Sequence, residues 1–211
     1  MNRFHPEALS LGSCEERVIK TNTTTIAVLE NFWADFDAVK AELEKLPIAP
    51  TAYNDQDMED YRSAWVSTIP GQELPFQEPL DSKILRMFAG NTPFFPALCP
   101  KVNVNWNRVG SDRIKNDFYN IHKDRGRYTT VVFMNDAYED TDGFNLYYPS
   151  SVPEPEHTYW FGREHNLADC FVRGVPNRAV IFPSYVPHGM EIRSQRFRDE
   201  WRCTCAIFHG D

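Results

Sequence analysis

Two residues with metal-binding side chains, His122 and Asp124, are separated by a single residue. Side chains alternate between the faces of a strand, so positions i and i+2 point to the same side and can bind one ion. Such a pair is also common on protein surfaces, and the surrounding sequence must decide. A second histidine would complete a set of two imidazoles and one carboxylate, which leaves coordination positions open on Fe(II). We predict that His188 is this ligand, because it ends a hydrophobic strand and turn expected within residues 178–189.

A second feature with chemical potential is Arg202, which opens a predicted strand over residues 201–208. Alternation places Arg202, Thr204 and Ala206 on one face of this strand. A guanidinium on an inward face would be costly without an anionic partner, and its planar fork fits a carboxylate. Cys203 and Cys205 fall on the opposite face, where we interpret them as small buried hydrophobic side chains, with a zinc site as the alternative.

With these residues in this order, the sequence resembles the Fe(II)- and 2-oxoglutarate-dependent dioxygenases, most closely the branch that includes the prolyl 4-hydroxylases. The resemblance covers roughly residues 102–208, about half of the chain. It departs at Phe133, which stands where the family has a tyrosine that binds the co-substrate. The matching segments are His122-Lys123-Asp124, Phe133-Met134-Asn135, the strand from Asp142 through Gly143 to Pro149, Ala179 to Pro183 with Pro187-His188-Gly189, and Arg202-x-Thr204.

The resemblance implies a reaction and its metal. His122, Asp124 and His188 would be the metal ligands and catalytic residues that hold Fe(II), with O2 and 2-oxoglutarate as co-substrates and ascorbate as a further candidate cofactor. The implied activity is that of a dioxygenase that hydroxylates a C–H bond of an amino acid, a peptidyl residue or a small metabolite, releasing succinate and CO2. Asp124 argues for hydroxylation over halogenation, because related halogenases lack this carboxylate.

The resemblance also implies a binding site for 2-oxoglutarate. Arg202, helped by the Thr204 hydroxyl, would bind the far carboxylate, and Asn145 would be a further cofactor-binding residue. Arg198 is the competing candidate, because it lies ten residues after His188, the usual distance in the family, whereas Arg202 lies fourteen residues after it. We favour Arg202, because a loop lengthens at small entropic cost while the register of a strand cannot slip by one residue.

Two other classes of protein remain open. One is a cupin-like barrel that holds a metal for a reaction other than oxygenation, and the other is a non-enzymatic jelly-roll binding protein, because a fold does not specify a function. Arg202 with Thr204 favours the dioxygenase over a cupin, because a cupin does not require a buried arginine side chain that binds a dicarboxylate. The predicted metal ligands argue against a non-enzymatic role.

Length, composition and resemblance together predict one domain over residues 1–211. A chain of 211 residues with 42% hydrophobic residues can bury roughly 70% of its unfolded surface. The expected fold is mainly β with flanking helices (α+β), a double-stranded β-helix, also described as a jelly-roll or cupin-like barrel. Residues 1–100 would supply the N-terminal strand and helices that buttress the barrel, residues 101–209 its core, and residues 150–178 an inserted flap.

Local patterns predict further elements. We expect a strand at 23–29, a helix at 35–46 with Asp35 as N-cap, a short helix at 81–89, and a polar, irregular stretch at 47–79, either a solvated loop or a lid. The strand at 102–107 places three asparagines on one face, either toward solvent or lining a cavity. The insertion is a flap, a partner surface or a satellite core, and its His157 and His165 are predicted to be ordinary loop histidines.

Charge and cysteine content narrow the location and the partners. A formal charge of −8 and a pI near 5.3 make nucleic acid an unexpected partner. The family resemblance implies a small molecule or a peptide as the substrate. We find no signal peptide or membrane span, and five scattered cysteines suit a reducing compartment, so we expect a cytoplasmic protein. The oligomeric state is not predicted.

Overall fold

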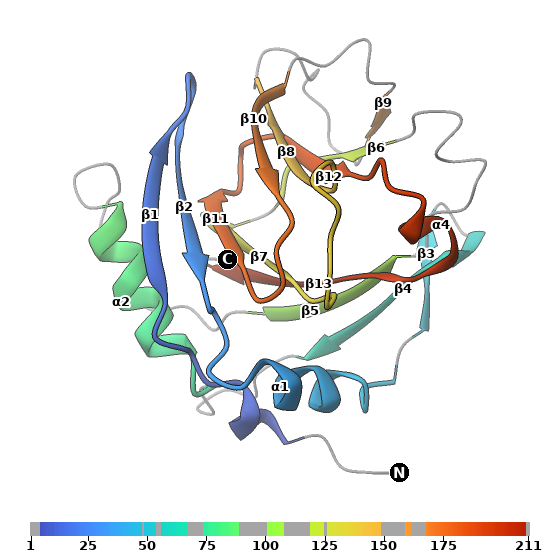
Figure 1. Ribbon diagram of the computed structural model, residues 1–211, viewed down its shortest axis with the longest axis horizontal. Helices are drawn as coiled ribbons and strands as arrows, with labels where there is room; N and C mark the ends of the chain where they lie inside the picture. The colour runs from blue at the N-terminus through green and yellow to red at the C-terminus, as the bar shows by residue number, and fades with distance from the viewer. Residues whose placement is uncertain are drawn as a thin grey trace.

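Antiparallel strands make up most of the structure. A computed structural model of the chain describes residues 5–47, 49–53, 56–66, 74–88, 101–107, 119–124, 126–148, 159–161 and 168–209. Within these residues every strand pair is antiparallel, and the two helices of eight or more residues are α1 (Phe36–Leu43) and α2 (Gln77–Met87) (Figure 1). The predicted class, mainly β with flanking helices, is confirmed at this level.

A large sheet of eight strands forms one layer of the molecule. In it, strands distant in sequence lie side by side, because β7 pairs with both β11 and β13. The order across the sheet is β1 (Glu15–Lys20), β2 (Thr25–Glu30), β11 (Ala179–Pro183), β7 (Tyr128–Phe133), β13 (Arg202–His209), β5 (Lys101–Asn107), β4 (Gln56–Val66) and β3 (Ala49–Tyr53).

A smaller layer faces the large sheet. Its three strands run in the order β10 (Ala168–Arg173), β8 (Gly143–Tyr147) and β12 (His188–Glu191). Beside it lie β6 (Tyr119–Ile121) and β9 (Tyr159–Phe161), which pair with each other. A β-bridge between His122 and His188 joins the end of β6 to the start of β12. The small layer therefore brings together the two predicted histidine ligands.

Alternate residues of both sheets point into the space between them and form an apolar interior. Because side chains alternate along each strand, every second residue of a strand belongs to this interior. The neighbouring residues of β7 and β13 instead face the helices. The interior is built from Val131 and Phe133 of β7, Val180 and Phe182 of β11, Phe144 and Leu146 of β8, Val172 of β10, and Ile26 and Val28 of β2, with Val186 from the turn before β12.

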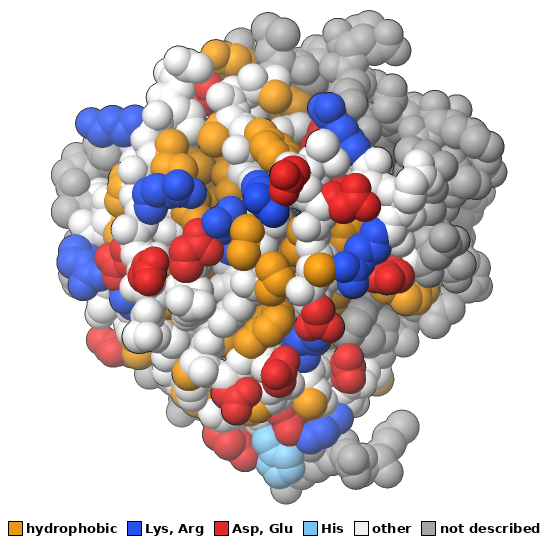
Figure 2. All heavy atoms as spheres, viewed as in Figure 1, with side chains coloured by type: hydrophobic (Ala, Val, Ile, Leu, Met, Phe, Trp, Pro, Cys, Tyr) orange, Lys and Arg blue, Asp and Glu red, His pale blue; other side chains and the backbone are white. Residues whose placement is uncertain are grey.

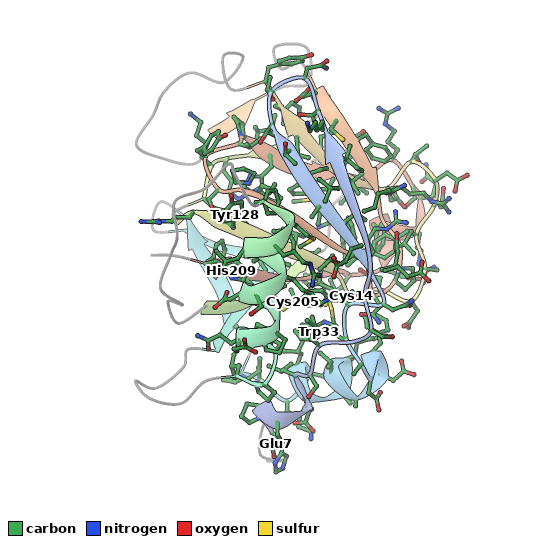
Figure 3. All side chains as sticks on the ribbon, turned by 90° about the vertical axis from the view of Figure 1, so that its left-hand side faces the viewer. Glu7, Cys14, Trp33, Tyr128, Cys205 and His209 are labelled. Carbon is green, nitrogen blue, oxygen red and sulfur yellow. The ribbon has the colours of Figure 1, made fainter. Side chains whose placement is uncertain are left out.

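The helices cover the other face of the large sheet. Leu80 and Ile84 of α2 pack in one cluster with Tyr128 and Cys205 of the sheet. Figure 3 shows α2 lying over the sheet where Tyr128 and Cys205 are labelled. Helix α1 begins as predicted, since the side chain of Asp35 accepts a hydrogen bond from the Ala38 N–H at 2.9 Å. The longest described helix, α2, has 11 residues, and none of the described helices is long and apolar enough to cross a membrane.

The cysteines of β13 lie in this helix-facing layer. Cys203 is 6% exposed and Cys205 is fully buried, in the cluster that includes residues of α1 and α2. Burial raises the pKa of the Cys205 thiol to about 12, and burial also raises that of Cys203. Both thiols therefore behave as small hydrophobic side chains, as predicted.

Residues 47–79, predicted to be irregular, contain β3 and β4 and the first residues of α2. Strand β4 pairs with β5 from Tyr61 opposite Asn107 to Val66 opposite Val102. The prediction was wrong because this stretch lacks apolar alternation, while a sheet edge offers backbone hydrogen bonds to any strand laid beside it. Helix α2 likewise begins before its predicted start at Asp81, and β1 was not predicted.

The predicted insertion, residues 150–178, is partly sheet. Strand β10 pairs along the whole of β8, with Phe171 opposite Asn145 and Val172 opposite Phe144. Its exposed Phe171 and buried Val172 follow the alternation of a strand that covers an apolar interior on one side. The many aromatic residues between 150 and 178 made the alternation along β10 difficult to recognise in the sequence. His157 and His165 lie outside the described residues, and so do the side chains of the asparagines in β5.

Asp169 of β10 fastens the turn between β1 and β2 to the small layer. Its carboxylate accepts hydrogen bonds from the hydroxyls of Thr21 and Thr23, both at 2.6 Å, and from Nδ2 of Asn22 at 2.9 Å. Burial alone would raise the pKa of this carboxyl, but these hydrogen bonds outweigh it and lower the pKa to about 2. Asp169 is therefore ionised at neutral pH and ties the hairpin to β10.

Charges of both signs are interspersed on the face of the molecule seen in Figure 2, around a band of hydrophobic side chains. Several of the described charges form ion pairs, including Arg178 with Glu30 and Arg173 with Asp140, each with an N–O distance of 2.6 Å. Among the described residues on this face, positive and negative side chains are therefore mixed rather than gathered into regions of one sign.

Candidate metal centre

His122, Asp124 and His188 are brought together by backbone pairing. The N–H and C=O of His122 each bond to His188 at 2.9 Å, so the end of β6 is fixed against the start of β12. The N–H of Asp124 donates to the carbonyl of Ser184, in the turn between β11 and β12, at 3.0 Å. Backbone hydrogen bonds therefore hold residues from two distant parts of the chain in one register.

The three side chains converge with distances suited to a single ion. Oδ1 of Asp124 lies 3.4 Å from Nε2 of His122, and Oδ2 lies 3.2 Å from Nε2 of His188. One ligand atom from each residue lies within 4.8 Å of the others, and these three form the one such group among the described residues. Two imidazole nitrogens and a carboxylate oxygen are a donor set that suits a divalent transition metal. The structure thus assembles the predicted ligands.

His188 is held in one orientation. Its Nδ1 lies 2.9 Å from the carbonyl oxygen of Val186, and because a carbonyl only accepts, Nδ1 carries the proton and Nε2 keeps its lone pair for the site. The ring packs between Phe144 and Phe182, at centroid distances of 5.3 and 4.7 Å. Such a hydrogen bond to the second ring nitrogen is the usual way in which a ligating histidine is oriented.

The site opens to solvent on the His122 side. The side chain of His122 is 29% exposed, against 3% for His188 and 11% for Asp124. Burial alone would raise the pKa of Asp124, but the charge and hydrogen bonds that His188 and His122 supply when both nitrogens of each ring are protonated outweigh it and lower the pKa well below its usual range. The carboxylate is consequently ionised, which is the form that binds a cation.

Two buried hydroxyls, which the sequence reasoning missed, support the carboxylate. Thr129 Oγ1 lies 2.8 Å from Oδ2 of Asp124 and 2.9 Å from Oγ of Ser184. A signal was present in the sequence, since Thr129, Val131 and Phe133 share one strand face and a hydroxyl in an apolar row requires a polar partner.

Arg202 lies on the interior face of β13, as its predicted register requires. It is 4% exposed, its guanidinium carbon lies 6.0 Å from the ring centroid of Phe133, and Nη2 donates to the carbonyl of Gly143 at 3.4 Å. Thr204 on the same face is also buried. Leu146 pairs with His188 and lies three residues after Gly143 on β8. Gly143 and Leu146 are therefore roughly 10 Å apart along the strand.

The remaining two predicted positions lie elsewhere. Asn145 points away from the interior residues Phe144 and Leu146 on either side of it, and its amide donates to Glu191 at 2.7 Å, so the structure does not bring it to the metal ligands. Arg198 lies in the short helix α4 (Arg196–Asp199) before β13, and its side chain is outside the described residues.

Several solved structures share this fold, and one of them is described as a member of the 2OG-Fe(II) oxygenase family. A prolyl-4-hydroxylase from Pseudomonas putida superposes with a TM-score of 0.55 and 17% identity, covering 90% of this chain and 94% of that chain. An oxidoreductase of the 2OG-Fe(II) oxygenase family from Burkholderia pseudomallei gives 0.53 and 14%, covering 88% and 85%. HygX from Streptomyces hygroscopicus, solved with nickel, 2-oxoglutarate and hygromycin B, gives 0.51 and 14%, covering 90% and 84%.

At such low identity these likenesses establish a shared fold. No family model matches the sequence, and no curated protein matches it as a relative. The fold resemblance predicted from the order of the sequence segments is thereby confirmed by structure rather than by sequence similarity.

Proposed function

We propose that the protein is an Fe(II)- and 2-oxoglutarate-dependent oxygenase that hydroxylates a C–H bond of an amino acid, a peptidyl residue or a small metabolite. The observation that carries this proposal is the convergence of His122, Asp124 and His188 within 4.8 Å, on the fold that such oxygenases share. The topology also supports a double-stranded β-helix, with β5, β7, β11 and β13 as one side of the barrel and β6, β8, β10 and β12 as the other.

The donor set fits iron. His122 and His188 would contribute neutral Nε2 atoms and Asp124 a carboxylate oxygen, the arrangement of two histidines and one carboxylate that leaves positions open on Fe(II). When bound, Fe(II) with 2-oxoglutarate and O2 would supply the oxidising chemistry, with succinate and CO2 released and a hydroxyl left on the substrate carbon. The chain would supply the placement of these ligands, because the Val186 carbonyl orients the His188 ring and backbone hydrogen bonds join His122 to His188.

Arg202 would bind the far carboxylate of 2-oxoglutarate. Arg202 is 4% exposed on the interior face of β13, and its planar fork can bind both oxygens of a carboxylate. Gly143, whose carbonyl Arg202 contacts, and Leu146, which pairs with His188, lie roughly 10 Å apart along β8. This separation suits a five-carbon dicarboxylate bound at both ends. Thr204, one strand repeat further into the barrel, would assist through its hydroxyl, whereas the position of Asn145 gives no support to its predicted role.

The substrate would be a small molecule or a peptide. Two structures with this fold support this range, because HygX was solved with hygromycin B bound and the Pseudomonas putida protein is described as a prolyl-4-hydroxylase. Cytoplasmic location belongs to the same proposal, because the scattered cysteines suit a reducing compartment.

Succinate formation is the direct test. Purified protein with Fe(II), ascorbate, O2 and 2-oxoglutarate should release succinate at a slow uncoupled rate, and a panel of amino acids, peptides and metabolites should contain compounds that raise it. His122→Ala, Asp124→Ala and His188→Ala should each abolish this turnover and the bound iron while the protein stays folded. Wild-type turnover and iron content in these variants would overturn the proposal.

A further inference from the structure

A pair of buried hydroxyls lies directly behind the Asp124 carboxylate. Thr129 belongs to the interior face of β7, and Ser184 immediately follows β11. Both residues are fully buried, and their oxygens lie 2.9 Å apart. The Ser184 carbonyl accepts a hydrogen bond from the Asp124 N–H, and the Ser184 N–H donates to the Arg127 carbonyl, each at 3.0 Å. The hydroxyl pair is therefore fixed to the same backbone that carries the ligand.

The hydrogens of this group can point in only one direction. A carboxylate only accepts, so the Thr129 hydroxyl donates its single hydrogen to Oδ2 of Asp124 at 2.8 Å. The Thr129 oxygen then has only acceptor capacity left, so the bond between the two hydroxyls is donated by Ser184. The result is a chain of donors from Ser184 through Thr129 to Asp124, in which each bond polarises the next.

We propose that Thr129 is a positioning residue for the metal ligand Asp124: its hydroxyl occupies Oδ2, fixes the carboxylate rotamer and leaves one oxygen for the ion. The inference rests on the proposed function, since it assumes that a metal binds at this group. Ser184 acts one step further back, because it contacts Thr129 and not the carboxylate. Outer hydrogen bonds of this kind typically change metal affinity by about 10- to 100-fold when removed.

The chain provides a matched control in the next residue. Thr130 is also fully buried in β7 but faces the other side of the sheet, where its hydroxyl lies 3.0 Å from Nε2 of His209. Thr129→Val and Thr130→Val therefore delete the same hydroxyl from the same strand at similar burial. They differ in whether the lost partner is the metal ligand, so general destabilisation by a buried valine affects both.

The test uses cobalt(II) alone as the probe, with its affinity and ligand-field absorption spectrum measured on the metal-free full chain. Thr129→Val should weaken cobalt binding by about 10- to 100-fold and alter the spectrum. Thr129→Ser, which keeps the hydroxyl, should stay within about threefold of wild type, as should Thr130→Val. Thermal unfolding of the metal-free proteins reports stability separately. Should Thr129→Val not fold, Thr129→Ala gives the same comparison without the crowding of a second methyl group.

Each result has a defined meaning. Wild-type affinity and spectrum in a folded Thr129→Val or Thr129→Ala variant would overturn the inference, and so would an equal loss in Thr130→Val or in Thr129→Ser. His122→Ala tests the metal site itself in the same titration. If that variant also binds cobalt as wild type does, the proposed function fails, whereas loss of binding in His122→Ala with none in the Thr129 variants refutes only the role of Thr129.

Discussion

Replacing Arg202 with alanine should weaken the binding of 2-oxoglutarate and leave the metal ligands intact. Arg202 is 4% exposed on the interior face of β13, where its guanidinium lies near the Phe133 ring and the Gly143 carbonyl. Water has little access there to replace a lost hydrogen bond. A carboxylate brought into this space would therefore lose its charged partner when the guanidinium is removed.

The size of the effect follows from the geometry. Removing one partner of a buried, hydrogen-bonded charge pair costs about 2–5 kcal/mol, and roughly 1.4 kcal/mol corresponds to a tenfold change in affinity. The apparent KM for 2-oxoglutarate should thus rise by about one and a half to three and a half decades in Arg202→Ala. Arg202→Lys keeps the charge and loses the planar fork, so its KM should lie between those of wild type and Arg202→Ala.

Succinate formation at varied 2-oxoglutarate concentration measures this effect. Cobalt affinity should stay within about threefold of wild type, and thermal unfolding shows whether the variant is folded. Arg198→Ala is the matched control, because this arginine lies in α4, outside the strand register that points Arg202 inward. We expect its KM to change less than about threefold. A large rise in Arg198→Ala with no rise in Arg202→Ala would transfer the role to Arg198 and refute the argument from strand register.

Three further outcomes follow from the fold. Because the folded-state pKa of Asp169 is lowered to about 2, its hydrogen bonds stabilise the protein above about pH 4, and this contribution is lost as the pH falls toward 2. The melting temperature of Asp169→Asn should therefore be lower than that of wild type at pH 6. An equal difference in melting temperature at pH 2 would contradict this. Burial raises the thiol pKa of Cys203 and Cys205, so iodoacetamide at pH 8 should alkylate the less buried Cys14 and Cys170 first, and mass spectrometry showing early labelling of β13 would contradict the packing. In Gly143→Ala the new methyl carbon would lie 2.2 Å from the Val172 carbonyl oxygen. Denaturant unfolding should therefore show a free energy of unfolding lower by about 1–3 kcal/mol. An unchanged free energy of unfolding would show that β8 and β10 move apart easily.

Features that depend on the spacing of neighbouring residues were predictable from the sequence. Strand alternation turned Arg202 and Thr204 inward and Cys203 and Cys205 outward, as predicted. The Asp35 cap was likewise a local matter, since a side-chain oxygen and an N–H three residues away meet whenever the helix forms. In each case one backbone geometry decides the outcome without reference to the rest of the chain. His122 and Asp124 do lie together, but not as two positions of one strand as predicted, because β6 ends at Ile121 and the Asp124 N–H bonds to the Ser184 carbonyl.

Features that depend on which strands become neighbours required the tertiary structure. His122 meets His188 only because β6 and β12 pair, and Thr129 supports Asp124 only because β7 and the turn after β11 lie beneath it. Strands β3 and β4 carry no apolar alternation, so only an available edge on β5 reveals them. Asn145 followed the family order in sequence, yet the register of β8 turned it away from the interior. Alternation fixes which residues of one strand share a face, whereas the pairing of distant strands decides where His122, Asp124 and His188 come together.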